Sequence, residues 1–333
     1  TFISIPGGVG NAGMGYMQIV FGYFIGYFIV AYVLLPLYYR MNLTTIYTYL
    51  QKRFGDYSHK TGAIYFLISR IAGASIRLLL VANILHQFIF KEWGLSFELT
   101  VAISILLIWV YTFRGGIKTI VWTDTLQTAF MLLAVVLTIF GIASQMDLSI
   151  TQLIGDVKES NLSDMFHFED YKAKNYFWKQ VVGGMFITIC MTGLDQDMMQ
   201  KNLTCKNLKE AQKNMVSFST ILIFVNLMFL FLGALLFLYS NSIGIDLPLN
   251  EKGSFIADQV FPSIALSGEL GIAVGILFIL GLVAAAYSSA DSALTSLTTT
   301  IFVDFMKNEN KDEKQQIKIR TIIHVAVSVV IFI

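Results

Sequence analysis

Charge is scarce in this chain, and that scarcity decides its class. Only 14% of the 333 residues are charged and 56% are hydrophobic, whereas soluble domains are about a quarter charged. Histidine and cysteine are also rare, at four and two residues. The cysteines, Cys190 and Cys205, match neither a disulfide framework nor a metal-ligand spacing. This composition excludes an ordinary soluble domain, and a net charge of +1 gives no reason to expect nucleic acid as a partner.

Long apolar runs fill most of the chain instead. A helix needs about 20 apolar residues to cross a bilayer, and the sequence does not show the short alternating pattern of a barrel strand. We therefore predict an all-α, polytopic membrane helix bundle. Its spans fall at about 14–39, 61–90, 97–113, 120–146, 177–199, 213–240, 270–303 and 319–333, with the end of another before Pro6.

The loops indicate the topology and carry two shorter helices. Most of the 23 Lys and Arg residues lie in every second loop, and these loops share one side of the membrane. We therefore predict that this side is cytoplasmic and that the protein is a multi-pass protein of the plasma (inner) membrane. On the basic side, "TTIYTYLQKRFG" predicts an interfacial helix that ends before Gly55. On the other side, "GSFIADQVF" predicts a helix that lies on the membrane surface or caps the bundle.

A carboxylate and several hydroxyls lie at membrane depth in "AAAYSSADSAL". Ser288, Asp291 and Ser292 fall on one helix face, and Ser289 lies beside them. Small and hydroxyl residues are common where membrane helices pack together. Asp291 favours a different interpretation, because an ionisable residue inside a span costs at least about 2.5 kcal/mol. Carboxylate and hydroxyl oxygens suit a hard cation such as Na⁺.

A second acid, Asp124, begins the span after a basic loop. Asp124 and Gln127 fit a capping box that would start the helix. Counting residues along the two spans brings Asp291 to the same inner half of the membrane. Asp124 is thus either a helix cap or a second carboxylate at the depth of Asp291.

Two arginines, and an acidic pair that follows a glycine, complete the polar groups at membrane depth. Arg70 and Arg77 lie seven residues apart, on one helix face. We expect a structural role for Arg70, whereas Arg77 either pairs with a buried acid or contacts the substrate. Gly193 precedes the acidic pair Asp195 and Asp197. A helix either breaks there and offers backbone groups to a ligand, or simply ends at the cytoplasmic surface.

Five stretches together resemble a known family. "RGGIKTIVWTDTLQT" is similar to the signature of the sodium:solute symporter family, which includes the sodium–sugar, sodium–proline and sodium–sialic acid carriers. "FISIPGG" resembles the end of that family's first core helix, and "TYLQKRFG" resembles its inner loop. "DQDMMQKNLTCKN" resembles the stretch after its sixth core helix, and "AAAYSSADSAL" resembles its eighth. The order and spacing agree over nearly the whole chain.

The resemblance implies a LeuT-type fold, in which two inverted five-helix repeats hold solute and sodium near the middle of the bilayer. Residues 1–333 would be a single transmembrane transporter domain, with one repeat at about 1–146 and a second, truncated repeat at about 177–333. The chain would begin in the last turn of the first core helix, stop in the ninth and lack the tenth.

The resemblance also implies a main sodium site. In the family this site uses hydroxyls at the positions of Ser288 and Ser289 and a backbone carbonyl at that of Ala285. It also uses carbonyls from the first helix, which would fall before residue 1. The fragment alone is therefore not expected to bind sodium normally.

Some family members hold a further sodium ion. Its ligands are the Asp at the position of Asp124 and serines at the positions of Ser288, Asp291 and Ser292. The chain departs from the family at Asp291, where a carboxylate replaces a hydroxyl. A second acid would tighten the site, substitute for the ion when protonated, or pair with an arginine.

Three residues are implied in solute binding. Arg77 falls about where the sialic acid carriers place an arginine that meets the substrate carboxylate, which favours an acidic or zwitterionic solute. Met191 takes the place of the aromatic residue that gates the pocket in sugar carriers. Gln18, in the first full span, completes the predicted substrate site.

The function expected from these residues is secondary active transport. Inward flow of Na⁺, the coupling ion, would drive uptake of a small organic solute by alternating access. The alternative is a membrane sensor that binds a solute through the same fold and signals through an appended domain. An intramembrane hydrolase would need Asp124 and Asp291 as a carboxylate pair. The sequence lacks a nucleophile–base motif and a catalytic-metal spacing, so we expect no enzyme.

Overall fold

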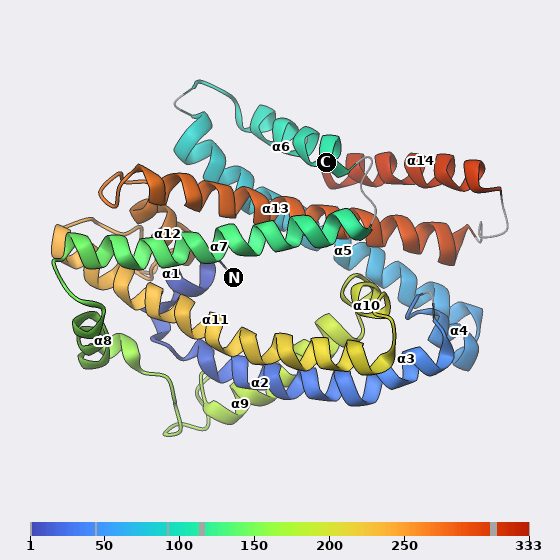
Figure 1. Cartoon of the computed structure of the whole chain (residues 1–333), viewed down its shortest axis with the longest axis horizontal. Helices are drawn as coiled ribbons and strands as arrows, with labels where there is room; N and C mark the ends of the chain where they lie inside the picture. The colour runs from blue at the N-terminus through green and yellow to red at the C-terminus, as the bar shows by residue number, and fades with distance from the viewer. Residues whose placement is uncertain (1, 44, 92, 113–116, 307–311, 333) are drawn as a thin grey trace. The chain divides into compact units, whose positions relative to one another are not determined.

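The computed structural model describes residues 2–43, 45–91, 93–112, 117–306 and 312–332. Within these ranges it does not describe the side chains of 107–112, 117–123, 286–291, 313 and 332. The described backbone is mostly helical. In chain order the helices are α1 Ser4–Ala12, α2 Tyr16–Ile29, η1 Val30–Leu34, α3 Leu35–Met41, α4 Thr48–Phe54, α5 Asp56–Leu85, η2 His86–Phe90, α6 Phe97–Thr112, α7 Ile117–Gln145, α8 Ile150–Glu159, η3 Asn161–Ser163, α9 Phe177–Thr188, η4 Ile189–Gly193, α10 Gln196–Leu203, α11 Leu208–Ile243, α12 Ala257–Ala265, α13 Ile272–Thr300, η5 Ile301–Phe305 and α14 Glu313–Phe332 (Figure 1).

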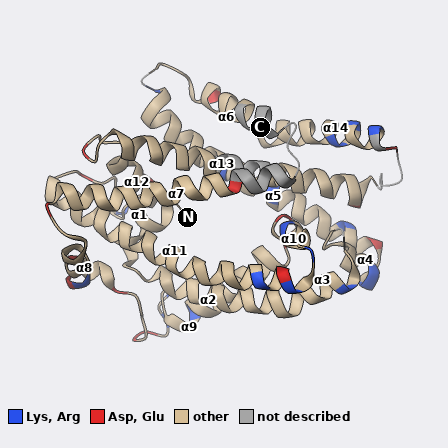
Figure 2. Ribbon diagram, in the orientation of Figure 1, with Lys and Arg blue, Asp and Glu red and all other residues tan. Residues whose placement is uncertain are grey.

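Each predicted span coincides with a helix or with consecutive helices, which confirms the all-α prediction. Within the described residues, four helical stretches are long and apolar enough to cross a membrane: Tyr16–Met41, Asp56–Phe90, Asp124–Gln145 and Leu208–Ile243. Figure 2 shows long stretches without charge on α2 and α11, and Lys and Arg residues on α4 and at the start of α14. The predicted short helices are also present, as α4 and α12.

The first helix runs further than predicted. The sequence places its end before Pro6, whereas α1 extends from Ser4 to Ala12. Pro6 is the third residue of this helix, where a backbone N–H would have no partner within the helix. Its missing N–H therefore costs nothing, and the helix continues to Gly13, whose positive φ of 57° ends it.

The span predicted at 177–199 is broken. Helix α9 and the π-turn η4 end at Gly193, and α10 begins at Gln196 after a bend of 66°. The Asp195 side chain caps α10 by accepting a hydrogen bond of 3.2 Å from the Met198 backbone N–H. Of the two alternatives left open at Gly193, the structure shows the break.

The described chain forms two compact units. Unit 1 comprises Thr1–Ile29, Gln127–Ile189 and Met215–Leu282. Unit 2 comprises Val30–Leu126, Cys190–Asn214 and Val283–Ile333. Both units draw on both predicted repeats, and the repeat boundaries stay a prediction.

Close backbone packing holds unit 1 together. Helices α2 and α9 lie side by side (Figure 1). A Cβ atom on Gly22 would lie 2.1 Å from the Val181 carbonyl oxygen, and one on Gly26 would lie 2.7 Å from that of Met185. Two glycines four residues apart allow such an approach between membrane helices. Any larger side chain at Gly22 would push the two backbones apart.

An aromatic cluster fills the rest of that core. The Phe2 ring lies 5.4 Å from the rings of both Phe261 and Phe278, and 6.3 Å from that of Phe229. All four side chains are buried. Edge-to-face and stacked pairs add about 0.5–1.5 kcal/mol each beyond the area they bury. The described core of unit 1 is thus largely apolar.

Unit 2 has a different interior. Helix α5 contacts α4, α6, α14 and η5, and α14 also contacts α6. Among the described residues of this unit, the buried His, Arg and Asp side chains are His59, Arg70, Asp197 and Asp304. Their partners make up the candidate site.

Candidate functional site

An ionic cluster in unit 2 surrounds Arg70 of α5. Its Nη2 atom pairs with Asp195 Oδ1, and with Asp197 Oδ2 at 3.1 Å. Arg70 is 9% exposed and Asp197 is 5% exposed. Removing one partner from such a buried group would leave an uncompensated charge, so the three side chains depend on one another. The structural role predicted for Arg70 is confirmed.

Ser292 of α13 joins this cluster. Its hydroxyl donates a hydrogen bond of 2.7 Å to Asp197 Oδ1, and the serine is buried. One predicted sodium residue is therefore held by the broken helix, through the carboxylate that Arg70 also binds. Hydrogen bonds to charged groups are the stronger ones, worth about 1.5–3 kcal/mol.

Asp124 of α7 has a cationic partner. Its Oδ2 atom lies 2.9 Å from the Lys201 Nζ atom of α10, and each side chain is about a third exposed. The capping interpretation of Asp124 is wrong, because α7 begins seven residues earlier, at Ile117. The acid is the eighth residue of the helix, beyond the free backbone N–H groups that a cap would satisfy.

A second polar cluster lies where α13 continues into η5. Asp304 Oδ1 accepts hydrogen bonds of 2.8 Å from the Thr45 hydroxyl and from the ring of His59. All three side chains are buried. Nearby, burial raises the pKa of the Tyr47 phenol above its usual value, and the Asp195 charge raises it further. This cluster links the end of α13, the helix that carries Ser292, to the loop before α4 and to the start of α5.

The break in the span is anchored from a neighbouring helix. The Tyr38 hydroxyl of α3 donates a hydrogen bond of 2.9 Å to the Gly193 carbonyl oxygen. The Gln196 side-chain oxygen accepts one of 2.8 Å from the Ile46 backbone N–H. One of the backbone groups that the break exposes is therefore bound by the protein itself.

Two of the predicted substrate residues, Arg77 and Met191, are exposed in unit 2. Arg77 lies on α5, two turns beyond Arg70, and Met191 lies in η4 with 56% of its surface exposed. Within the part of the chain whose side chains are described, Arg77 has no carboxylate in ion-pair distance. Its predicted substrate contact stays a prediction.

The third predicted substrate residue, Gln18, is buried in unit 1. Its Nε2 atom donates to the carbonyls of Gly15 and Asn175, at 3.3 and 3.1 Å. Its Oε1 atom accepts a hydrogen bond of 3.1 Å from the His167 backbone N–H. In this arrangement Gln18 fastens the loop before α9 onto α2, and its assignment to a solute site stays a prediction.

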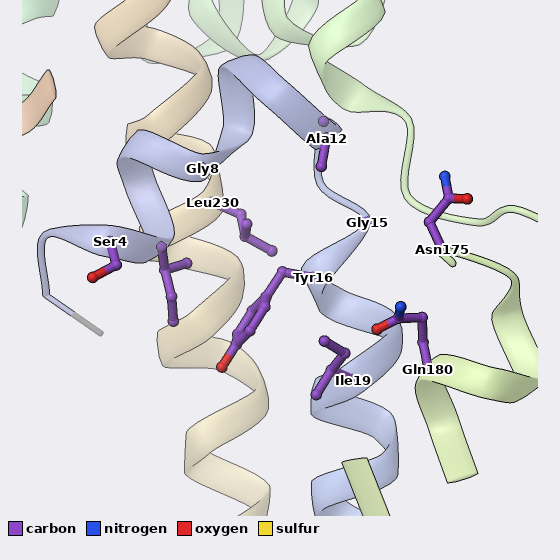
Figure 3. A pocket seen from close by; sticks show the side chains of 11 residues that line it. Ser4, Gly8, Ala12, Gly15, Tyr16, Ile19, Asn175, Gln180 and Leu230 are labelled. Carbon is purple, nitrogen blue, oxygen red and sulfur yellow. The ribbon is translucent and has the colours of Figure 1, made fainter. Parts of the chain in front are cut away.

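A cavity of about 410 Å³ also lies in unit 1. Figure 3 shows the Tyr16 side chain pointing from α2, which also carries Ile19, toward the ribbons that carry Ser4 and Leu230. Its lining, all of it described, includes no Asp, Glu, Lys or Arg, and none of the three predicted substrate residues. This cavity therefore offers an acidic solute no counter-charge.

The remaining predicted sodium residues can be placed only in part. Ala285 lies in the described part of α13 and is half-buried. The side chains of Ser288, Ser289 and Asp291 lie outside the described residues.

Two residues of the site were missing from the sequence interpretation. The sequence indicates Asp197 only as part of a possible helix break, and Lys201 is one of the many basic residues of the cytoplasmic loops. Their spacing of four residues on α10 is a usable signal, because it puts both side chains on one helix face. Their partners on α13 and α7 could not be inferred from that spacing.

These features define a class of protein: the part of the chain that the structure describes has several long apolar helices, one broken span and an ionic cluster beside the break. Membrane transporters of the secondary type have these features. The sequence profile of the sodium:solute symporter family matches residues 1–333, and the chain belongs to that family. It is an integral, multi-pass membrane protein.

Relatives and solved structures agree with this family. The chain is 26% identical over 300 residues to the sodium/sialic acid symporter NanT of Aliivibrio fischeri, covering 88% of this chain and 56% of that protein. It is 28% identical over 209 residues to the sodium-coupled monocarboxylate transporter 1 of Mus musculus, covering 62% and 33%. The chain thus spans about half the length of the first relative and a third of the second.

The fold has a solved counterpart. The chain is similar to a substrate-bound outward-open state of a Na⁺-coupled sialic acid symporter, with a TM-score of 0.86 and 21% identity. The match covers 99% of this chain and 69% of the other. The predicted LeuT-type, all-α fold is confirmed.

Proposed function

We propose that the protein is a sodium-coupled secondary active transporter that imports a small acidic solute by alternating access. The observation that carries this proposal is the broken span. Its two halves meet at a bend of 66°, and Asp197 just beyond the break holds Ser292 of α13. Discontinuous helices at the binding site, linked to an ion-binding helix, are typical of secondary transporters. The family match supports the same function.

The ion site that we propose lies on α13 and α7. Ser288, Ser289 and the Ala285 carbonyl would bind the main sodium ion, and Asp124 with Asp291 and Ser292 would tune it or bind another. One charge that moves through 100 mV releases about 2.3 kcal/mol. Sodium must stabilise the outward-open, solute-competent state more than the alternative for that energy to drive uptake.

The solute that we propose carries a carboxylate. Support comes from Arg77, an exposed arginine on a membrane helix without an ion pair among the described side chains. An arginine there needs an anionic partner or water, and the guanidinium binds carboxylates through paired hydrogen bonds. Relatives named for sialic acid and for monocarboxylates also support an acidic solute. Gln18 and Met191 are proposed as further contacts on its path.

The solute class can be tested by uptake into proteoliposomes. The protein is expressed at the full length that its gene encodes, and an inward sodium gradient is imposed. We expect accumulation of sialic acid or of a short monocarboxylate, and less of a neutral sugar. A potassium gradient of the same size is the control. If every acid, amino acid and sugar in the panel failed to accumulate, the proposal would be wrong.

The sodium residues can be tested in the same vesicles. Replacing Ser288 and Ser289 together by Ala removes two oxygen ligands, so the sodium concentration at half-maximal uptake should rise sharply. Replacing Ser263, a serine of α12 whose hydroxyl bonds only the Gln259 carbonyl of its own helix, by Ala is a matched control. An unchanged sodium requirement in the double variant would remove both serines from the site.

The sensor alternative has no support of its own among these observations. The relatives are named as a symporter and a transporter. No catalytic role is proposed for Asp124 or Asp291.

A further inference from the structure

One face of α10 bears the partners of two predicted sodium residues. Asp197 accepts the Ser292 hydroxyl at 2.7 Å, and Lys201 lies 2.9 Å from Asp124. Asp197 and Lys201 are four residues apart, so their side chains project from the same face of the helix. The short helix therefore reaches both α13 and α7 at once.

We propose that Lys201 is a built-in cation that takes the place of a sodium ion at Asp124. In this arrangement the lysine ammonium neutralises the carboxylate, and a sodium ion binds there only when the ammonium leaves. Lys201 thereby sets the number of sodium ions coupled to each solute. This inference rests on the proposed function, and it concerns which cation Asp124 holds.

The anchoring of α10 keeps the ammonium in reach. Arg70 binds both Asp195 and Asp197, and Asp195 also caps the helix. Ser292 adds a third link, through its hydrogen bond to Asp197. A cation tethered in this way has a high effective concentration at its partner, because it does not have to diffuse to it.

Electrostatic repulsion prevents the Lys201 ammonium and a sodium ion from binding the Asp124 carboxylate at the same time. A sodium ion on the same carboxylate would lie within a few ångströms of the ammonium, and two like charges at that distance repel strongly. The pair is only modestly strong, since about 30% of each side chain is exposed and solvent screens partly exposed ion pairs. Sodium can therefore compete with Lys201, and removal of the lysine charge should favour sodium.

The experiment compares sodium titrations of the purified full-length protein. Thermal stability in detergent is measured as sodium replaces choline at constant ionic strength. Lys201→Gln removes the competing charge, so the sodium concentration at half-maximal stabilisation should fall by about two- to fivefold, the range expected for a partly exposed ion pair. Lys201→Arg keeps the charge and should match the wild type. Lys209→Gln, at an exposed lysine of α11, is the matched neutral control.

A second readout is the steepness of sodium-activated uptake. If Asp124 gains a sodium ion when the lysine charge is lost, the Hill coefficient for sodium should rise in Lys201→Gln and not in Lys209→Gln. In the background of Asp124→Asn, Lys201→Gln should change neither readout, because no carboxylate remains for the cations to share.

The outcomes separate this inference from the proposed function. A wild-type protein that takes up no solute would contradict the proposed function, while the thermal titration would still test the lysine. Lys201→Met is the second variant should Lys201→Gln fail to fold. The inference is overturned if both neutral variants need as much sodium as the wild type or more, or if sodium stabilises none of the proteins.

Discussion

The two compact units are held together by different kinds of contact. Unit 1 is held by close helix contacts at glycines and by a cluster of phenylalanine rings. Every ion pair found among the described side chains lies in unit 2: His59 with Asp304, Arg70 with two carboxylates, and Lys201 with Asp124.

This difference has a physical meaning. Apolar and glycine contacts depend on shape alone and tolerate no change in backbone distance. Buried ionic contacts are costly to form, yet their charges can be exchanged for an ion or another partner. The unit that holds the predicted sodium residues is the one whose interior responds to charge.

The largest expected effect is the loss of the central charge of unit 2. Arg70→Met leaves the buried Asp197 and the half-buried Asp195 without their cation, so stability should fall by about 3–5 kcal/mol. The measurement is the melting temperature in detergent, with the exposed Arg53→Met of α4 as the control. Adding Asp195→Asn and Asp197→Asn removes the unpaired charges and should restore much of the loss. If the triple variant were no more stable than Arg70→Met, charge compensation would not explain this cluster.

The next effect tests unit 1 by shape. Gly22→Leu places a side chain where a Cβ atom would already lie 2.1 Å from the Val181 carbonyl oxygen. Overpacking of this kind costs about 1–3 kcal/mol. Gly183→Leu on α9 is the control, because a Cβ atom there meets nothing within 4 Å. Equal melting temperatures for the two variants would contradict the close packing of α2 and α9.

The third prediction contrasts the two arginines of α5. Arg77→Gln removes an exposed charge, so stability should barely change. If Arg77 binds the solute carboxylate, the half-saturating concentration of an acidic solute should rise about tenfold, and that of a neutral solute should not. Uptake kinetics measure this, and Arg77→Lys should be intermediate because it keeps the charge. An equal effect on acidic and neutral solutes would assign Arg77 another role.

The smallest effect concerns the cluster at the end of α13. Asp304→Asn keeps an oxygen that accepts from Thr45 and His59 but removes its charge, so stability should fall by about 1 kcal/mol. Thermal unfolding measures the loss, and Asp258→Asn, at a half-buried acid of unit 1 that accepts a hydrogen bond from Ser4, is the comparison. A larger loss at Asp258 would reverse the contrast between the two units.

The sequence was a good guide to the helices, because apolar length is a local property. All eight spans and the short helices α4 and α12 were predicted from runs of adjacent residues, and the break at Gly193 was one of two alternatives at that position. The failures were at helix ends. The predictions for α1 and Asp124 depended on Pro6 and on a capping pattern, and both helices continue through those signals.

The side-chain pairs of the site could be predicted from the sequence less well than the helices. The structural role of Arg70 was predicted, because a buried arginine must have a partner. Its partner Asp195 lies 125 residues away, and Lys201 lies 77 residues from Asp124. No local pattern specifies such pairs, since they depend on how α5, α7 and α10 pack.

The most direct test of the central claim is the steady-state ratio of sialic acid inside and outside proteoliposomes. With an inward sodium gradient and a negative interior, the ratio should exceed one and grow with the gradient. It should return to one when a sodium ionophore is added, because the driving force is then lost. A ratio that exceeds one without sodium, or that ignores the ionophore, would contradict sodium-coupled import.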